Sequence, residues 1–514
     1  MRNLRFTVLL QVALLAPVAD AVCAQEAKQT AGAGTIQMEV PLAPPPVQAS
    51  LPDLGNPADS ILSRADEYQV GRMVMSNLRR ETKLFEDPET VDYLQSVASR
   101  IGVEAQDGEH RLTLFAIRDP SVNAGAMLGG FIGVNTGLIL LTSNESELAG
   151  VLAHEIGHVV QRHMVRAIQA QGRSSLATMA AMLAGILLGA ATGNADAIPG
   201  VVALAQGTAM QQQINFTRME EHEADRVGIG YLAAAGYDPN TMAGFFSAMQ
   251  RDRGLAGDNI PPLLLDHPVD SIRIAEARSR AKSMPPYPRR AESPNFPFIR
   301  ERVRVLAAAD DNDQRRYYER MRRNDPNNAS LVYGAALAEM KAGSAQTAVT
   351  LLKPLVAQNP QLTLLQSALA QAQFAAGQKD DGISTFDHGL AVSPRNVPMT
   401  VHYAEALLDM GRAAKAHQLL LDLFNNVAPT PEQIRLIALA ASAAGDTGDA
   451  YFYMSEFHIS SGDLMLATTQ LDLALAAPNL TEVQRKRFLA RREEIRTYLR
   501  EQRGDRSNRT QPAG

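Results

Sequence analysis

The sequence has little capacity for covalent cross-linking, since its 514 residues include one cysteine, Cys23, and no tryptophan. A single thiol excludes a disulfide framework, and a chain of this length can bury cores that need no such links. Neither positive nor negative charge dominates the sequence, because the net charge is -6 and the sequence pI is about 6.0. This balance gives no reason to expect nucleic acid as a partner.

The amino terminus has the pattern of an export signal. Residues 1–24 combine a basic start, an apolar run and small residues, which is typical of a secretory signal peptide and too short for a membrane span. Cleavage after Ala24 would remove the only cysteine. Lipidation of Cys23 is an alternative, but the preceding residues, Asp20-Ala21-Val22, are a poor match to the sequence that precedes a lipidated cysteine. We predict a soluble periplasmic protein whose residues 25–56, rich in Pro, Ala and Gly, form a flexible lead.

A mixed region of helices and strands follows. Residues 57–101 space their apolar side chains for one-sided burial on helices. Residues 111–118 alternate and predict a strand, and 131–137 predict a second strand introduced by Gly129-Gly130. An open edge on such a strand could pair with an extended substrate, or the strand could be purely structural.

The most informative motif is His154-Glu155-Ile156-Gly157-His158. Apolar positions between 146 and 162 recur at helical spacing, so the two histidines share one face and can bind one metal ion. Zn²⁺ suits imidazole and carboxylate ligands and leaves one position open for water. Glu155 could then accept the proton of that water and pass it to the leaving amine. Because H-E-x-x-H also arises by chance, a third ligand decides the question.

His163 is a poor third ligand, because it lies five residues past His158 and the extended three-histidine motif requires six. A helix opening at Met219 offers Glu221 and Asp225, four apart on one face. The first could complete the zinc tetrahedron, and the second could accept the free N–H of a ligating histidine. Alternatively, an acidic helix start only favours the helix dipole.

At this point the chain resembles a known family, the gluzincin peptidases that include the Ste24-type CAAX proteases. The resemblance covers roughly residues 57–280 and rests on these segments: Asn123-Ala124, Gly129-Gly130, Glu147–His158 and Glu221–Asp225. It implies one Zn²⁺ per chain held by His154, His158 and Glu221, with Glu155 as base and Asp225 behind the ligands.

The segment from His267 to Arg273, on a turn bounded by Pro268, resembles a second histidine motif of that family. In the periplasmic members with tetratricopeptide tails, such a histidine can occupy the open metal position and displace the water. We predict that His267 gates the enzyme; alternatively, it is a surface histidine that caps the following helix. Arg273 could stabilise the reaction oxyanion or pair with Asp266.

Residues 174–194 carry no charge and are long enough to cross a bilayer. They are diluted by Ala, Gly, Ser and Thr, which favours a buried or interfacial helix near the cleft. Peripheral contact with a membrane through 174–194 is an alternative to burial, and a spanning helix is the less favoured interpretation.

A period of 34 residues marks the carboxy-terminal half: Gly343, Gly377, Gly411 and Gly445. Pro326, Pro360 and Pro394 repeat with the same period. This is the tetratricopeptide signature of two helices per repeat, and about four repeats would stack into a solenoid with a ligand-facing groove. The groove could dock clients, or the repeats could only stabilise the peptidase. We interpret four histidines of this half as ordinary helix residues: His388, His402, His417 and His458.

These observations predict a mainly α (α+β) protein: a zincin-type metallopeptidase domain with a small sheet, followed by an α-solenoid. The expected parts are a signal peptide (1–24), a flexible lead (25–56), the peptidase (57–284), a connecting segment (285–325), the repeats (326–500) and a disordered tail (501–514).

The resemblance implies a zinc endopeptidase in quality control or maturation of outer-membrane proteins. Its expected partners are unfolded or misassembled outer-membrane proteins and their assembly machinery. A chaperone or adaptor whose metal site is quiescent is the alternative function.

Overall fold

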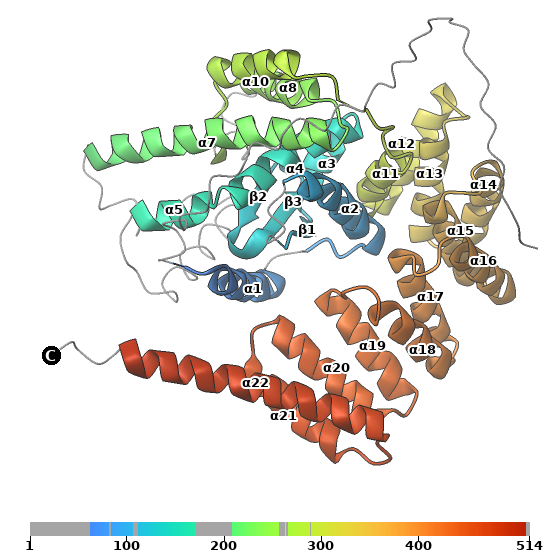
Figure 1. Cartoon of the computed structure of the whole chain (residues 1–514). Coiled ribbons are helices and arrows are strands. Elements are labelled where there is room, and N and C mark those ends of the chain that lie inside the picture. The colour runs from blue at the N-terminus through green and yellow to red at the C-terminus, as the bar shows by residue number, and fades with distance from the viewer. Residues whose placement is uncertain are drawn as a thin grey trace, which may run out of the picture. The chain divides into compact units, whose positions relative to one another are not determined.

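The computed structural model describes residues 62–81, 84–105, 111–170, 208–255, 263, 266–287 and 289–509. The expected signal peptide (1–24), the lead (25–56) and the uncharged segment 174–194 lie outside these residues. Helices dominate the described chain, and three short strands lie among the helices of its first half (Figure 1). None of the described helices is both long enough and apolar enough to cross a membrane.

Two helices precede the sheet, α1 (Arg64–Glu81) and α2 (Pro88–Glu104), where the periodicity predicts them. Asp87 starts α2, because its carboxylate accepts a hydrogen bond of 3.0 Å from the backbone N–H of Thr90. Pro88 fits the first turn, where its missing N–H would have no helical partner.

The sheet has the order β1-β3-β2. β1 (Thr113–Ile117) runs parallel to β3 (Phe131–Asn135), and β2 (Ala124–Met127) runs antiparallel to it. The two predicted strands are confirmed, although the second ends before Thr136. β2 was missed because Ala-Gly-Ala-Met has no alternation. β3 is the central strand, so the sheet edges belong to β1, which Leu84 bridges at Ile117, and to β2, which contacts α4.

The H-E-x-x-H motif lies on α4 (Glu145–Val160), which follows the short helix α3 (Thr136–Leu141). The Asn144 side chain caps α4 by accepting a hydrogen bond of 2.9 Å from the N–H of Glu147. Almost every residue of α4 is buried, because the sheet, α2 and α7 (Thr208–Ala234) pack around it.

α4 and α7 cross closely because each has a glycine at the contact. A Cβ on Gly157 would lie 3.0 Å from the carbonyl oxygen of Ala224, and one on Gly228 would lie 2.8 Å from that of Ala153. Larger side chains would hold the helices apart. The two glycines therefore set the distance between the H-E-x-x-H helix and the acidic helix.

α7 begins at Thr208, eleven residues before the predicted start at Met219. Glu221 and Asp225 are consequently mid-helix residues, and the interpretation of an acidic helix start that favours the dipole is wrong. The predicted start was too late because polar residues, including Gln211-Gln212-Gln213, interrupt the apolar positions of 208–218. The remaining described helices of this half are α5 (His163–Ala170), α8 (Asn240–Leu255) and α10 (Ser271–Ser283).

Two helices connect the halves, α11 (Phe296–Ala307) and α12 (Asp311–Asn324). The repeats then form consecutive helix pairs: α13 (Ala329–Lys341) with α14 (Ala345–Gln358), α15 (Thr363–Ala375) with α16 (Lys379–Val392), α17 (Val397–Asp409) with α18 (Ala413–Phe424), and α19 (Pro431–Ala443) with α20 (Thr447–Ser460). Figure 1 shows these pairs stacked in sequence order.

The 34-residue period is explained by the turn inside each pair. Gly343, Gly377, Gly411 and Gly445 all have positive φ, between 71° and 84°. That conformation is strained for residues with a Cβ, so glycine recurs at each turn. The predicted fold class, a helical protein with a small sheet and tetratricopeptide repeats, is confirmed.

The end of the chain differs from the prediction. After α21 (Leu464–Ala476), helix α22 runs from Glu482 to Arg509, so residues 501–509 are helical rather than disordered, and 510–514 lie outside the described residues. The first residues past the predicted boundary, Glu501, Gln502 and Arg503, are good helix formers and favour continuation of the helix.

A buried ionic network joins α2 to the repeats. Glu89 of α2 lies 3.0 Å from His402 Nε2 on α17 and 2.8 Å from Arg302 Nη2 on α11. The Ser367 hydroxyl of α15 donates a further hydrogen bond of 2.9 Å to Glu89. His402 is therefore not an ordinary helix residue, because it ties the peptidase half to the third described repeat.

We expect Gly228→Ala to lower the free energy of unfolding by about 1–3 kcal/mol, because its methyl group would overlap the carbonyl of Ala153. Gly230→Ala on the same helix is the matched control. A Cβ there meets nothing within 4 Å, and alanine favours helix by about 0.5–1 kcal/mol. Urea unfolding followed by circular dichroism measures both, and equal effects would contradict a close helix crossing.

His402 predicts a pH dependence of stability. Burial lowers its pKa, but the carboxylate of Glu89 outweighs burial and raises the pKa to about 10. An unfolded histidine titrates at about pH 6.5, so the stability that His402 contributes is fully present below that pH and is lost as the pH rises toward 10.

Between pH 6.5 and 9.5 the wild type should therefore lose about 1.5–3 kcal/mol more stability than His402→Gln. Replacement of the exposed His388 by Gln is the control and should follow the wild type. Urea unfolding at the two pH values tests this, and parallel losses in wild type and His402→Gln would refute it.

Candidate metal centre

Four side chains converge between α4, α7 and the loop before α10. The possible ligand atoms of His154, His158, Glu221 and His267 all lie within 4.8 Å of one another. The Nε2 atoms of His154 and His158 are 3.1 Å apart, and each lies 3.4 Å from an oxygen of Glu221. The structure thus brings together the two helix histidines and the carboxylate that the sequence placed more than sixty positions away.

These separations fit a tetrahedral ion. Zn²⁺ binds such ligands at about 2.0–2.2 Å, which places neighbouring ligand atoms roughly 3.3–3.6 Å apart. His267 Nδ1 is 3.3 Å from His154 Nε2 and 2.9 Å from Glu221 Oε1, so it lies near a fourth corner. The donor set, two or three imidazoles and one carboxylate, is also one that zinc accepts.

Glu155 points to the same place from a different side of α4. It is fully buried, and its Oε2 accepts a hydrogen bond of 3.0 Å from the backbone N–H of Ala126 on β2. Its Oε1 is 3.5 Å from His267 Nε2. The missed strand β2 therefore holds the carboxylate that the sequence predicts as the base.

Asp225 lies behind His154, with its Oδ1 2.9 Å from the Nδ1 of that ring. Arg273 binds the same carboxylate through Nε and Nη2, at 2.7 and 2.8 Å. Burial raises the pKa of Asp225, but the hydrogen bonds from Arg273 and His154 outweigh it and lower the pKa below its usual value. Asp225 is therefore an ionised acceptor for the ring.

Arg273 also reaches Glu221, because its Nη1 lies 2.8 Å from Oε2 of that carboxylate. The predicted alternative partner, Asp266, is wrong: its carboxylate instead accepts a hydrogen bond of 3.0 Å from the Asn123 side chain. Sequence spacing missed the Arg273 contacts because they depend on the packing of α10 against α7.

The structure excludes the alternative in which His267 caps the helix that follows it, α10. The cap of α10 is Asp270, which accepts hydrogen bonds of 2.9 and 2.8 Å from the N–H groups of Ile272 and Arg273. His267 is therefore not the capping residue of that helix. Its ring lies edge-on to those of His154 and His158.

The comparisons with known proteins agree with this site. Residues 88–281 match the description "Peptidase family M48". A putative beta-barrel assembly-enhancing protease of Vibrio cholerae is 34% identical over 375 residues, which is 72% of this chain and 76% of that protein. The beta-barrel assembly-enhancing protease of Escherichia coli K12 is 30% identical over 453 residues, 87% of this chain and 91% of that protein.

A solved tetratricopeptide-repeat protein of Thermus thermophilus is 20% identical to this chain. The match covers 38% of this chain and 98% of the solved protein. Its TM-score of 0.25 is too low to bear on function.

The curated relatives match along most of their own length, so the likeness is not limited to the metal motif. The prediction of a metallopeptidase is confirmed by these matches together with a cluster that can hold a metal. The chain belongs to peptidase family M48 and, within it, to the beta-barrel assembly-enhancing proteases.

Proposed function

We propose that this chain is an exported zinc endopeptidase that acts on outer-membrane β-barrel proteins in the periplasm. The observation that carries the proposal is the tetrahedral spacing of His154, His158 and Glu221 beside the buried carboxylate of Glu155. The substrate class and compartment rest on the names of the relatives and on the expected signal peptide.

Zn²⁺, when bound by these three ligands, would lower the pKa of a water molecule and polarise the substrate carbonyl. Glu155 would accept the proton of the water and deliver it to the leaving amine. The N–H of Ala126 keeps one oxygen of Glu155 occupied, so the other oxygen is the one that exchanges protons.

Asp225 and Arg273 act as positioning residues in this proposal. Asp225 fixes the His154 ring so that Nε2 faces the metal site. Arg273 uses three nitrogens on Asp225, Glu221 and the carbonyl of Pro268, which leaves little capacity for a reaction oxyanion. Its proposed function is therefore to neutralise two buried carboxylates.

His267 supports a latent resting state. Its Nδ1 lies at hydrogen-bonding distance from Glu221 and 3.3 Å from His154 Nε2, where a water or substrate oxygen would have to enter. Its Nε2 faces Glu155, so the same ring approaches both the open corner and the base. Movement of His267 away from the cluster would open the site.

The edge strand β2 supports binding of an extended substrate. Ala126 places β2 next to Glu155, and a Cβ added to Gly125 would meet no atom within 4 Å. An unfolded β-barrel segment is extended and could pair with this edge through main-chain hydrogen bonds.

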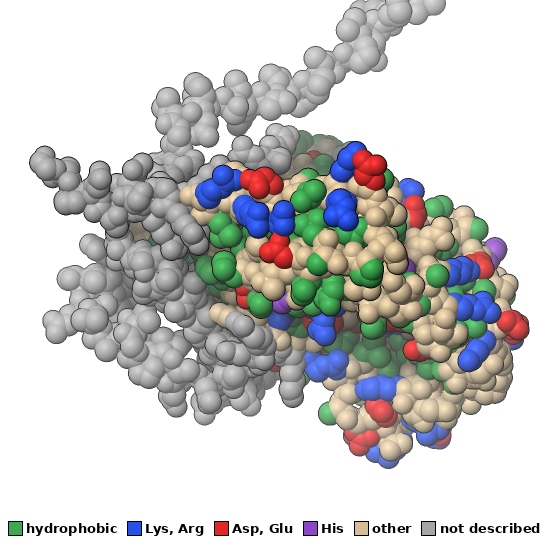
Figure 2. Space-filling model, turned by 90° about the horizontal axis from the view of Figure 1, so that it is seen from below, with side chains coloured by type: hydrophobic (Ala, Val, Ile, Leu, Met, Phe, Trp, Pro, Cys, Tyr) green, Lys and Arg blue, Asp and Glu red, His purple; other side chains and the backbone are tan. Residues whose placement is uncertain are grey.

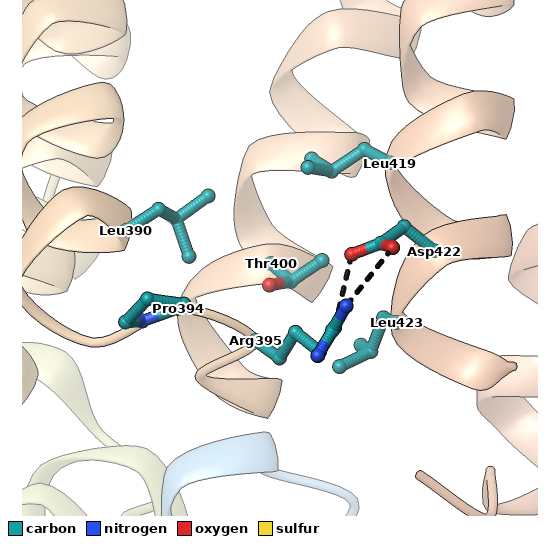
Figure 3. Close-up of a pocket in the computed structure, with 7 residues that line it drawn as sticks. All are labelled: Leu390, Pro394, Arg395, Thr400, Leu419, Asp422 and Leu423. Atoms are coloured by element: carbon teal, nitrogen blue, oxygen red, sulfur yellow. Dashed lines mark hydrogen bonds and ion pairs between the residues drawn. The ribbon is translucent and has the colours of Figure 1, made fainter. Parts of the chain in front are cut away.

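The repeats would dock clients or the assembly machinery. One pocket of about 310 Å³ lies between α16, α17 and α18, with Leu390, Leu419 and Leu423 around an ion pair of Arg395 with Asp422 (Figure 3). The face in Figure 2 intersperses basic, acidic and apolar side chains.

We expect Glu155→Gln to lower the rate of cleavage of casein or an unfolded β-barrel protein by about 10²–10⁴-fold, because an amide cannot accept the proton. Binding of the substrate should be unchanged. Glu147→Gln, in the first turn of the same helix, is the control. Gel assays and pull-downs measure the two effects.

The same experiment distinguishes a peptidase from the alternative function, a chaperone or adaptor. If wild type and Glu155→Gln both bind the unfolded protein and neither cleaves it, the chain is a chaperone or adaptor with a quiescent metal site.

We expect His267→Ala to cleave unfolded casein several-fold faster than wild type, because the ring that approaches the open corner is removed. His222→Ala, which removes a more exposed histidine of α7, should leave the rate unchanged. The initial cleavage rate at saturating zinc is the measurement. A variant that is no faster than wild type would show that His267 does not gate the site.

A further inference from the structure

His163, excluded above as a ligand, lies directly behind His158. Its Nδ1 is 2.8 Å from the Nδ1 of His158, and the ring centroids are 4.7 Å apart with an interplanar angle of 80°. His158 Nε2 points the other way, toward His154 and Glu221. Both nitrogens of His158 are thus engaged, one by the metal cluster and one by His163.

His163 is itself held in place. It is 3% exposed, and its Nε2 lies 3.2 Å from Oε2 of Glu223. The same oxygen accepts a hydrogen bond of 2.8 Å from Nη1 of Arg166. Contacts therefore run from His158 on α4 through His163 at the start of α5 to Glu223 on α7.

The backbone between the two histidines has an unusual conformation that produces this contact. Arg162 has a positive φ of 53°, which costs a residue with a Cβ about 1–3 kcal/mol. Its buried side chain donates to Glu67 Oε1 at 2.8 Å and to the carbonyl of Leu62 at 2.6 Å. These bonds hold the turn that ends α4 and brings His163 back beside His158.

The proton positions along these contacts are mutually consistent. A ligand nitrogen must present a lone pair, so His158 Nε2 is bare and its Nδ1 carries the proton. That N–H donates to the lone pair of His163 Nδ1. The proton of His163 then lies on Nε2, where it donates to the carboxylate of Glu223.

We propose that His163 and Glu223 are positioning residues that fix the tautomer and the ring plane of His158 for zinc binding. They would do for His158 what Asp225 does for His154, through an imidazole instead of a direct carboxylate. The inference rests on the proposed function, because it takes His154, His158 and Glu221 as zinc ligands. Outer contacts of this kind typically change metal affinity by about 10–100-fold.

The test measures zinc affinity rather than peptidase activity. The metal-stripped full chain is titrated with Zn²⁺ in competition with a chromophoric chelator. We expect His163→Phe to raise the dissociation constant of zinc by about 10–100-fold. Glu223→Gln should raise it by a smaller factor, and His163→Asn should recover part of the affinity, because its amide oxygen can accept near the position of Nδ1.

Two further measurements distinguish a specific loss of zinc affinity from a general loss of folded structure. His222→Gln, next to Glu221 on α7 but paired with Glu276 outside the cluster, should bind zinc like wild type. The melting temperature of the metal-free Glu223→Gln protein should stay near that of wild type, since Glu223 is partly exposed, while its increase on addition of zinc should shrink.

The outcomes separate this inference from the proposed function. If wild type binds zinc, Glu221→Gln does not, and both His163→Phe and Glu223→Gln bind with the wild-type constant, the positioning proposal is overturned and the zinc site stands. If Glu221→Gln binds zinc as tightly as wild type, the ligand assignment itself fails, and the positioning proposal fails with it.

Discussion

The site depends on how closely two helices can approach. Gly157 and Gly228 each lie against backbone atoms of the opposite helix, at Ala224 and Ala153, so α4 and α7 approach closely at that point. The proposed ligands on α4 and α7 therefore lie at separations that one small ion could bridge. A methyl group at either glycine would push the two helices apart. Glu221 would then move relative to His154, although neither residue had been replaced. The metal chemistry is thus a consequence of backbone packing as much as of the motif residues.

A close approach of this kind also brings charges into a dry interior. Glu221 and Asp225 are both at least nine-tenths buried in side-chain surface, and Arg273 contacts each of them. An unpaired carboxylate at such a depth would be strongly destabilising, so the arginine is required by the geometry. The rings of the two proposed histidine ligands contact different partners, Asp225 for His154 and His163 for His158. Each ring is therefore fixed from a different helix.

Much of this arrangement could be predicted from the sequence, because the spacing within one helix determines which residues share a face. The pair His154 and His158 follows from that rule, and the recurring glycines follow from the positive φ of each repeat turn. Contacts between distant elements could not be predicted in this way. Glu89 meets His402 more than three hundred residues later, and no local pattern marks either residue as half of an ion pair. β2 escaped prediction because its small residues carry no periodic signal.

The same distant contacts bear on how the repeats relate to the metal centre. One continuous core includes Leu152 of α4, Val303 of α11 and Leu365 of α15, so the first repeats pack onto the peptidase half instead of following a linker. α2 packs on α4 and also carries Glu89, which binds His402 on α17. Removal of the repeats would expose apolar surface and leave Glu89 with fewer partners. The first repeats are therefore packed into the same core as α4, the helix that carries His154 and His158.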